Sequence, residues 1–128
     1  MAHHINVVTG IDFVVPVPLH TKRLRHRGFN QALLLAYTMS EVHHIPLSYD
    51  NLFRTRPTRP QVELSGVERV KNVAGAFCLK RPQEVTGKRV LLVDDVFTTG
   101  ATMNECASVL KASGAASVIA LTLARAGS

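Results

Sequence analysis

Residues 89–102 read RVLLVDDVFTTGAT, and this stretch determines the expected fold. Residues 89–93 are apolar after the first position, without polar alternation, which is typical of a strand buried on both faces of a parallel sheet. A helix is predicted from about Ala101 to Ser113, because apolar residues there recur at i, i+3, i+4 and i+7. Residues 117–124 form a second near-continuous apolar run. This order of strand, loop, helix and strand predicts a parallel sheet with right-handed crossovers.

Two further elements are predicted closer to the N-terminus. Residues 11–17 form a β-branched-rich run, which indicates a buried strand that Pro16 and Pro18 bring to an end. A helix is predicted from about Asn30 to Val42. The apolar stripes expected on the two helices are Leu33, Leu34, Tyr37 and Val42 on the first, and Met103, Cys106, Ala107 and Leu110 on the second.

Shorter elements are predicted between these helices. Residues 47–54 and residues 76–79 are each compatible with a short strand. Ser65 and Glu68 have the spacing of a capping box, in which two side chains satisfy the first amides of a helix. A short helix through about Asn72 is therefore predicted.

The size and composition of the chain indicate one globular domain. It has 128 residues, of which 46% are hydrophobic and 19% charged, and this balance excludes a disordered chain. We expect an α/β domain over residues 11–128, with a mostly parallel sheet of four or five strands flanked by helices. Residues 1–10 are weakly patterned and are set aside as an N-terminal extension or tag remnant.

Cysteine usage and hydropathy narrow the class of protein further. No apolar run reaches the ~18–20 residues of a membrane span, and no signal-peptide core opens the chain. Cys78 and Cys106 are far apart and form no C-x-x-C pair, which disfavours a zinc ribbon and a disulfide framework. We expect both cysteines to be core residues of a cytoplasmic protein.

Basic residues are concentrated in the middle of the chain. The formal net charge is +6, and residues 20–71 hold nine basic against four acidic residues. Such a segment indicates an anionic partner, either a phosphate-rich small molecule or nucleic acid. A solvated basic surface without a ligand is the alternative.

The chemistry of residues 94–102 suits a sugar phosphate. Asp94 and Asp95 follow a buried strand, at the edge where open α/β sheets bind ligands. Paired carboxylates need hydroxyl groups, cations or water as partners. The next residues, 98–102, open a helix, where free amides and the helix dipole favour an anion. In the alternative reading, the two acids only end a strand and a threonine caps the helix.

Residues 90–102 resemble the phosphoribosyl-pyrophosphate (PRPP) signature of type I phosphoribosyltransferases at every position. The resemblance implies that Asp94 and Asp95 hold the ribose hydroxyls and that residues 98–102 wrap the 5′-phosphate. It also implies Mg²⁺, bound through the ligand and not directly by the protein. The substrate-binding residues that follow from it are Leu19, His20, Thr21, Lys22, Val96, Phe97, Thr98, Thr99, Gly100, Ala101 and Thr102.

Other segments are similar to one branch of that family, the ComF proteins, which are linked to DNA uptake. The matching segments are VPVPLH at 15–20, RGFNQA at 27–32, the R-x-R-x-T-x-x-Q pattern at 54–61 and AF at 76–77. ComF-type proteins usually carry an upstream cysteine-rich zinc ribbon. Nothing of that kind precedes Val14, so ribbon functions are not carried over and the cover of the acceptor pocket is expected to be incomplete.

Two basic loops complete the expected site. By resemblance, residues 19–22 form the pyrophosphate loop, with backbone amides available to an anion. Residues 54–61 resemble the segment that closes over the reaction, where Arg56 would stabilise the leaving pyrophosphate as a catalytic residue beside Asp94 and Asp95. A basic loop that binds nothing is the alternative.

The resemblance implies Mg²⁺-dependent transfer of a phosphoribosyl group from PRPP to an unassigned acceptor, with release of pyrophosphate. The competing hypothesis is a non-catalytic PRPP- or nucleotide-binding accessory protein or sensor in DNA uptake, with single-stranded DNA as a partner. A third is an inactive domain kept for protein contacts. Aromatic residues make up only 5% of the chain, so stacking platforms for single-stranded DNA are scarce. A homodimer is a family-level expectation.

Overall fold

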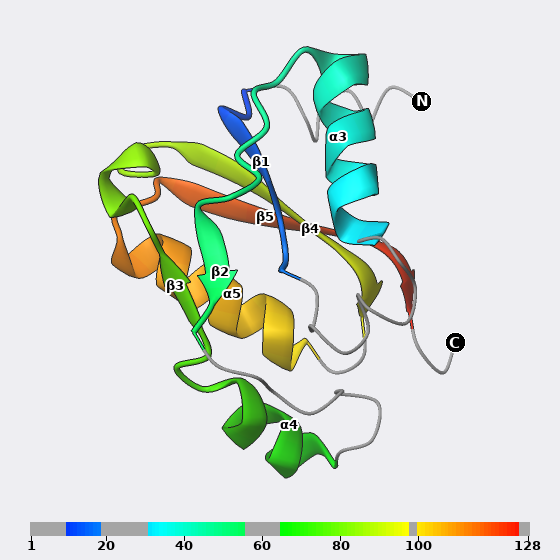
Figure 1. The fold of residues 1–128 in the computed structure, drawn as a ribbon, viewed down its shortest axis with the longest axis vertical. Helices are drawn as coiled ribbons and strands as arrows, with labels where there is room; N and C mark the ends of the chain where they lie inside the picture. The colour runs from blue at the N-terminus through cyan, green and yellow to red at the C-terminus, as the bar shows by residue number, and fades with distance from the viewer. Residues whose placement is uncertain (1–9, 19–30, 56–64, 98–99, 126–128) are drawn as a thin grey trace.

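A computed structural model describes residues 10–18, 31–55, 65–97 and 100–125 (Figure 1). Of the predicted N-terminal extension, only Gly10 lies within these ranges. The elements in chain order are β1 (Phe13–Pro16), α3 (Gln31–His43), β2 (Leu52–Arg54), α4 (Gly66–Val73), β3 (Phe77–Leu79), the 3₁₀ helix η2 (Pro82–Glu84), β4 (Arg89–Phe97), α5 (Ala101–Ala112) and β5 (Ser117–Arg125).

The main sheet is parallel and is built on β4. Within the described residues it has three strands in the order β1-β4-β5, with Val14 beside Leu91 and Leu91 beside Ile119. The predicted unit of strand, helix and strand is confirmed as β4, α5 and β5. The expected four or five strands are not found in the described part of the chain. Leu47 makes only an isolated parallel bridge to Val14, and the chain then leaves the sheet.

Beyond Leu47, β2 and β3 form a separate two-stranded antiparallel sheet, with Leu52 opposite Leu79 and Arg54 opposite Phe77. The segment that contains α4 connects the two strands, and this pair is called the β2–β3 hairpin below. Strand alternation places Phe77 and Leu79 in the core and leaves Cys78 exposed on the other face. The prediction that Cys78 is a core residue is therefore wrong, because this hairpin buries only one of its faces.

Helices cover the two faces of the parallel sheet (Figure 1). The alternation of side chains along β4 decides which of them meets which helix. Leu91 and Val93 pack on the side of α3. Val90 and Leu92 pack on the side of α5, together with the hairpin. All four side chains are fully buried. The central strand is thus enclosed on both faces, as its unbroken apolar sequence predicts.

The stripe predicted for α3 is wrong, whereas that for α5 is confirmed. Leu34, Tyr37 and Val42 are between 53% and 63% exposed, and α3 instead buries Ala32 and Ala36. Small residues on that face allow the helix backbone to lie close to β4. On α5 the buried apolar residues are Ala101, Met103, Cys106 and Leu110, and Ala107 packs against them half-buried.

The capping box predicted for the short helix α4 is present. The Glu68 amide donates to Ser65 Oγ at 3.3 Å, and the Ser65 amide donates to Glu68 Oε1 at 2.9 Å. These bonds satisfy amides that the first turn of a helix leaves without partners. None of the helices in the described ranges is long and apolar enough to cross a lipid bilayer.

Candidate functional site

The carboxyl ends of β1 and β4 are fixed side by side. The Val17 amide donates to the Val93 carbonyl oxygen at 2.8 Å, one residue before Asp94. Because the strands are parallel, Pro18, two residues after β1, and the acidic pair on β4 lie at the same edge of the sheet. Open α/β sheets bind their ligands at this edge.

Asp94 lies within the last part of β4, opposite Thr122 of β5. The strand continues to Phe97, four residues beyond the predicted end at Val93. Asp94 follows Leu92 by two residues, which places its half-buried side chain on the face covered by α5. A partly exposed carboxylate at this edge is suited to accept hydrogen bonds from sugar hydroxyls.

Cys106 of α5 lies in the core beneath this edge. Burial raises the pKa of its thiol, the negative charge of Asp94 raises it further, and the positive charge of Arg54 opposes that effect. The thiol therefore stays protonated near neutral pH and is no nucleophile. The charges of Asp94 and Arg54 are therefore both close enough to the Cys106 thiol to affect its pKa.

The N-terminus of α5 begins at a glycine, which allows a ligand to come close to the backbone amides there. Gly100 is the N-cap residue with φ 86° and no side-chain cap, and its carbonyl accepts from the Asn104 amide at 2.7 Å. This left-handed conformation is strained for residues other than glycine. Ala101 is buried and Thr102 is half-buried behind it. The first turn of α5 holds no acidic side chain, so its positive end meets no carboxylate of its own.

Arg54, at the end of β2, reaches the carboxyl end of β1. Its Nε donates to the Pro18 carbonyl oxygen at 3.0 Å, and its guanidinium carbon lies 4.8 Å from the centroid of the Phe77 ring. The sequence pattern predicts Arg54 only as part of a basic loop and gives it no role of its own in the site. The sequence signal that could have indicated a role for Arg54 is its position at the end of a short apolar segment, just before a stretch with further arginines.

The neighbouring backbone is held from the other side by the chain between α4 and β3. The Thr55 amide donates to the Ala76 carbonyl oxygen at 2.7 Å, and Thr55 Oγ1 donates to the Gly75 carbonyl oxygen at 2.9 Å. Gly75 in turn donates to Glu105 Oε2 of α5 at 3.3 Å. The end of β2 is thereby connected to α5, whose first residues belong to the candidate site.

Several predicted site residues lie outside the described ranges, and their contacts stay predictions. They are Leu19, His20, Thr21, Lys22, Arg56, Thr98 and Thr99. For Asp95, Val96 and Phe97 the structure gives the backbone of β4 but no side-chain surroundings. Of the residues assigned to the ligand, it fully describes Asp94, Gly100, Ala101 and Thr102, and it places all four at one edge of the sheet.

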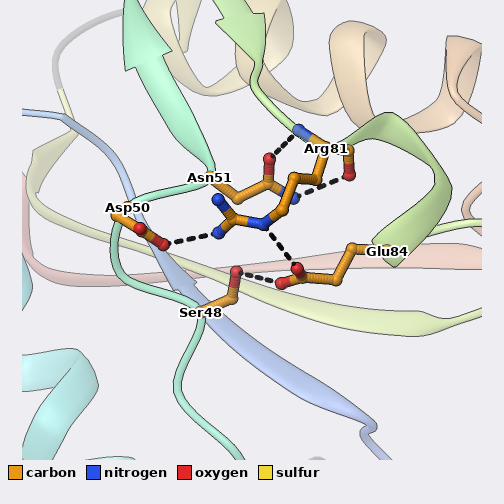
Figure 2. A network of polar contacts seen from close by, with 5 residues as sticks. All are labelled: Ser48, Asp50, Asn51, Arg81 and Glu84. Atoms are coloured by element: carbon orange, nitrogen blue, oxygen red, sulfur yellow. Dashed lines mark hydrogen bonds and ion pairs between the residues drawn. The ribbon is translucent and has the colours of Figure 1, made fainter.

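A polar network lies at the other end of the hairpin (Figure 2). Arg81 binds Asp50 Oδ1 at 2.6 Å through Nη2 and Glu84 Oε2 at 2.8 Å through Nε. The buried Asn51 side chain bonds both the amide and the carbonyl of Arg81. The hydrogen bond with Arg81 lowers the pKa of Asp50, and those with Glu84 and Asp50 raise that of Arg81. Since η2 precedes β4, this network lies away from the carboxyl ends.

The oxygen chemistry of the site suits Mg²⁺ held together with a phosphate ligand. Mg²⁺ prefers oxygen donors and is commonly bound by one or two carboxylates together with substrate phosphates. Asp94 at this edge is assigned by resemblance to the ribose hydroxyls, so Mg²⁺ would be held through the oxygens of bound PRPP and not directly by the protein. In the described ranges, no three His, Cys, Asp or Glu side chains gather closely enough to hold a metal ion by themselves.

Comparison with known proteins identifies the class. A family model described as phosphoribosyl transferase domain matches residues 30–128, and the chain therefore belongs to this family. A solved structure of glutamine PRPP amidotransferase from Bacillus subtilis, complexed with ADP and GMP, has TM-score 0.58 and 25% identity, covering 88% of this chain and 22% of that one. The type I phosphoribosyltransferase-like α/β fold expected from the sequence is confirmed.

Curated relatives confirm the resemblance to ComF-type proteins. The chain is 40% identical over 125 residues to DNA utilization protein YhgH of Escherichia coli strain K12, covering 95% of this chain and 54% of that protein. It is also 40% identical over 116 residues to competence protein F of Haemophilus influenzae, covering 90% and 51%. The chain thus spans about half the length of these relatives.

Proposed function

We propose that this phosphoribosyltransferase-family protein binds PRPP and transfers its phosphoribosyl group to an acceptor, with release of pyrophosphate. The observation that carries the proposal is that Asp94, in the last part of β4, and Gly100, the N-cap residue of α5, lie at one edge of the sheet. A ligand that carries both a diol and a phosphate uses these two features together, whereas a plain anion or a plain sugar uses only one.

In the proposed reaction, the bond between ribose C1 and the pyrophosphate oxygen breaks and a bond from the acceptor to C1 forms. Positive charge develops at C1 and negative charge on the leaving pyrophosphate. Asp94 and Asp95 orient the ribose through its hydroxyls, and Arg56 neutralises charge on the leaving group. Mg²⁺ bound with PRPP would supply further positive charge to the pyrophosphate.

The second candidate is a non-catalytic PRPP-binding protein that acts in DNA uptake. The names of the relatives, DNA utilization protein and competence protein F, favour this candidate because they describe a process and no reaction. Binding of single-stranded DNA and formation of a homodimer stay predictions in either case.

Titration calorimetry with PRPP and Mg²⁺, followed by an assay of pyrophosphate release against a panel of nucleobases and amines, tests the proposal. Saturable PRPP binding and acceptor-dependent pyrophosphate release are expected of the transferase. Saturable binding without release for any acceptor would support the accessory protein. No binding of PRPP would contradict both.

A further inference from the structure

We propose that Arg54 is a positioning residue, which holds Pro18, two residues after β1, against the β2–β3 hairpin at the sheet edge proposed to bind the pyrophosphate of PRPP. The pyrophosphate part of this inference rests on the proposed function. The fixation itself follows from contacts in the structure and can be tested without a ligand.

The contacts of Arg54 join two parts of the fold that no backbone ladder connects at this point. Pro18 follows β1 of the parallel sheet, whereas Arg54 and Phe77 are paired residues of the separate hairpin. The Nε–H of Arg54 donates to the Pro18 carbonyl oxygen at 3.0 Å while the guanidinium carbon stays 4.8 Å from the Phe77 ring centroid. Phe77 is buried, so the platform beneath the guanidinium is itself fixed.

This arrangement depends on the shape of arginine. A planar guanidinium can stack on an aromatic ring and donate a directed hydrogen bond at the same time. Lysine can place a charge near the carbonyl, but it offers no plane for the ring. Glutamine places an amide nitrogen where arginine has its Nε, but it lacks the charge and the rest of the guanidinium plane. Arg54→Lys and Arg54→Gln therefore remove different parts of the contact.

The contact matters because Arg54 and Pro18 each lie next to a segment that is predicted to bind pyrophosphate. Pro18 immediately precedes the predicted pyrophosphate loop at 19–22, and Arg54 stands two residues before Arg56. Thr55 is held in addition by the Ala76 and Gly75 carbonyl oxygens. Pro18 and Thr55, the described residues that precede the two basic segments, are thus held close to the edge of the sheet where Asp94 lies.

Arg81 offers a matched control within the same hairpin. Like Arg54, it makes more than one side-chain contact, and its partners Asp50 and Glu84 lie at the other end of the hairpin. Loss of its side-chain contacts disturbs the fold without touching Pro18. A general loss of stability would appear in both Arg54→Gln and Arg81→Gln, whereas a change confined to the carboxyl edge would appear only in the first.

The first experiment measures amide hydrogen exchange of the ligand-free wild type, Arg54→Gln, Arg54→Lys and Arg81→Gln, at conditions where each is folded. Exchange of the hydrogen-bonded amides of Val17 and Thr55, which flank the contact, is expected to be roughly tenfold faster in Arg54→Gln, from the loss of the guanidinium charge and its ring contact, and less so in Arg54→Lys. Arg81→Gln is expected to match the wild type at both amides. Equal exchange in Arg54→Gln and the wild type would overturn the inference.

The second experiment titrates PRPP and Mg²⁺ into the same variants. The dissociation constant is expected to rise roughly tenfold in Arg54→Gln, with partial recovery in Arg54→Lys, and to change less than about twofold in Arg81→Gln. Unchanged affinity in Arg54→Gln would overturn the link to pyrophosphate. If the wild type bound no PRPP, the proposed function would fail together with that link. Hydrogen exchange would still test whether Arg54 holds Pro18 against the hairpin.

Discussion

Replacement of Gly100 by alanine is expected to have two effects that can be measured separately, a loss of fold stability and a loss of PRPP affinity. Gly100 has φ 86° and ψ 0° at the N-cap of α5, and a residue with a Cβ pays about 1–2 kcal/mol to adopt such a conformation. In a domain of this size, each kcal/mol lowers the melting temperature by roughly 3–6 °C. Gly100→Ala is therefore expected to remain folded at room temperature, with a melting temperature lower by several degrees.

Gly87→Ala is the control for this substitution. Gly87 has φ 74°, and a Cβ added there would meet no atom within 4 Å, so its cost is almost purely conformational. Its amide donates to the Gly114 carbonyl oxygen in the turn before β4, away from the candidate site. The two variants are expected to lose similar stability in thermal melts followed by circular dichroism.

The variants are expected to differ in ligand affinity. A Cβ at Gly100 would stand where the backbone is proposed to approach the 5′-phosphate, and the loss of one charged hydrogen bond weakens PRPP binding roughly tenfold or more. Gly87→Ala is expected to bind as the wild type does in titration calorimetry at a temperature where both are folded. An equal affinity of Gly100→Ala and Gly87→Ala would refute the proposed approach of phosphate to Gly100.

Three further outcomes are expected from the described contacts. Ellman's reagent should react with exposed Cys78 in the folded protein and with buried Cys106 only after denaturation; rapid reaction of both would contradict the described burial. Leu91→Ala should lose about 2–5 kcal/mol in urea unfolding, since this central side chain is fully buried; a loss below 1 kcal/mol would show that the sheet is not packed on both faces. Because Arg81 lowers the pKa of Asp50, the charged pair stabilises the fold above the ordinary carboxyl pKa near about 4, and the difference in melting temperature between the wild type and Asp50→Asn should shrink as the pH falls below that value; a constant difference would argue against the ion pair.

The parts of the fold that local sequence determines were predictable. In β4 every residue from Val90 to Val93 is apolar, which requires cover on both faces, and the periodicity of α5 marks its buried side without reference to the rest of the chain. The capping box at Ser65 is likewise a local pattern. Asp94 and Gly100 could be proposed for a similar reason, because both belong to one continuous signature of adjacent residues, and their roles toward a ligand stay predictions.

Features that depend on tertiary placement were not predictable. The face of α3 that meets the sheet is chosen by how closely the helix approaches, so Ala36 is buried and the larger Leu34 is exposed. Cys78 is exposed because its strand belongs to a hairpin with one buried face. The role inferred for Arg54 requires Pro18 and Phe77, which are far apart in sequence, to meet at one side chain.

The central claim is that a single ligand, PRPP, occupies the edge of the sheet between the acids of β4 and the first turn of α5. The most direct measurement is the affinity of Mg²⁺-PRPP for the wild type and for a double variant with Asp94→Asn and Asp95→Asn, both confirmed as folded by circular dichroism. Loss of the two carboxylates that accept the ribose hydroxyls is expected to weaken binding by roughly 100-fold or more. An affinity unchanged in the double variant would contradict the assignment of this edge as the ribose site.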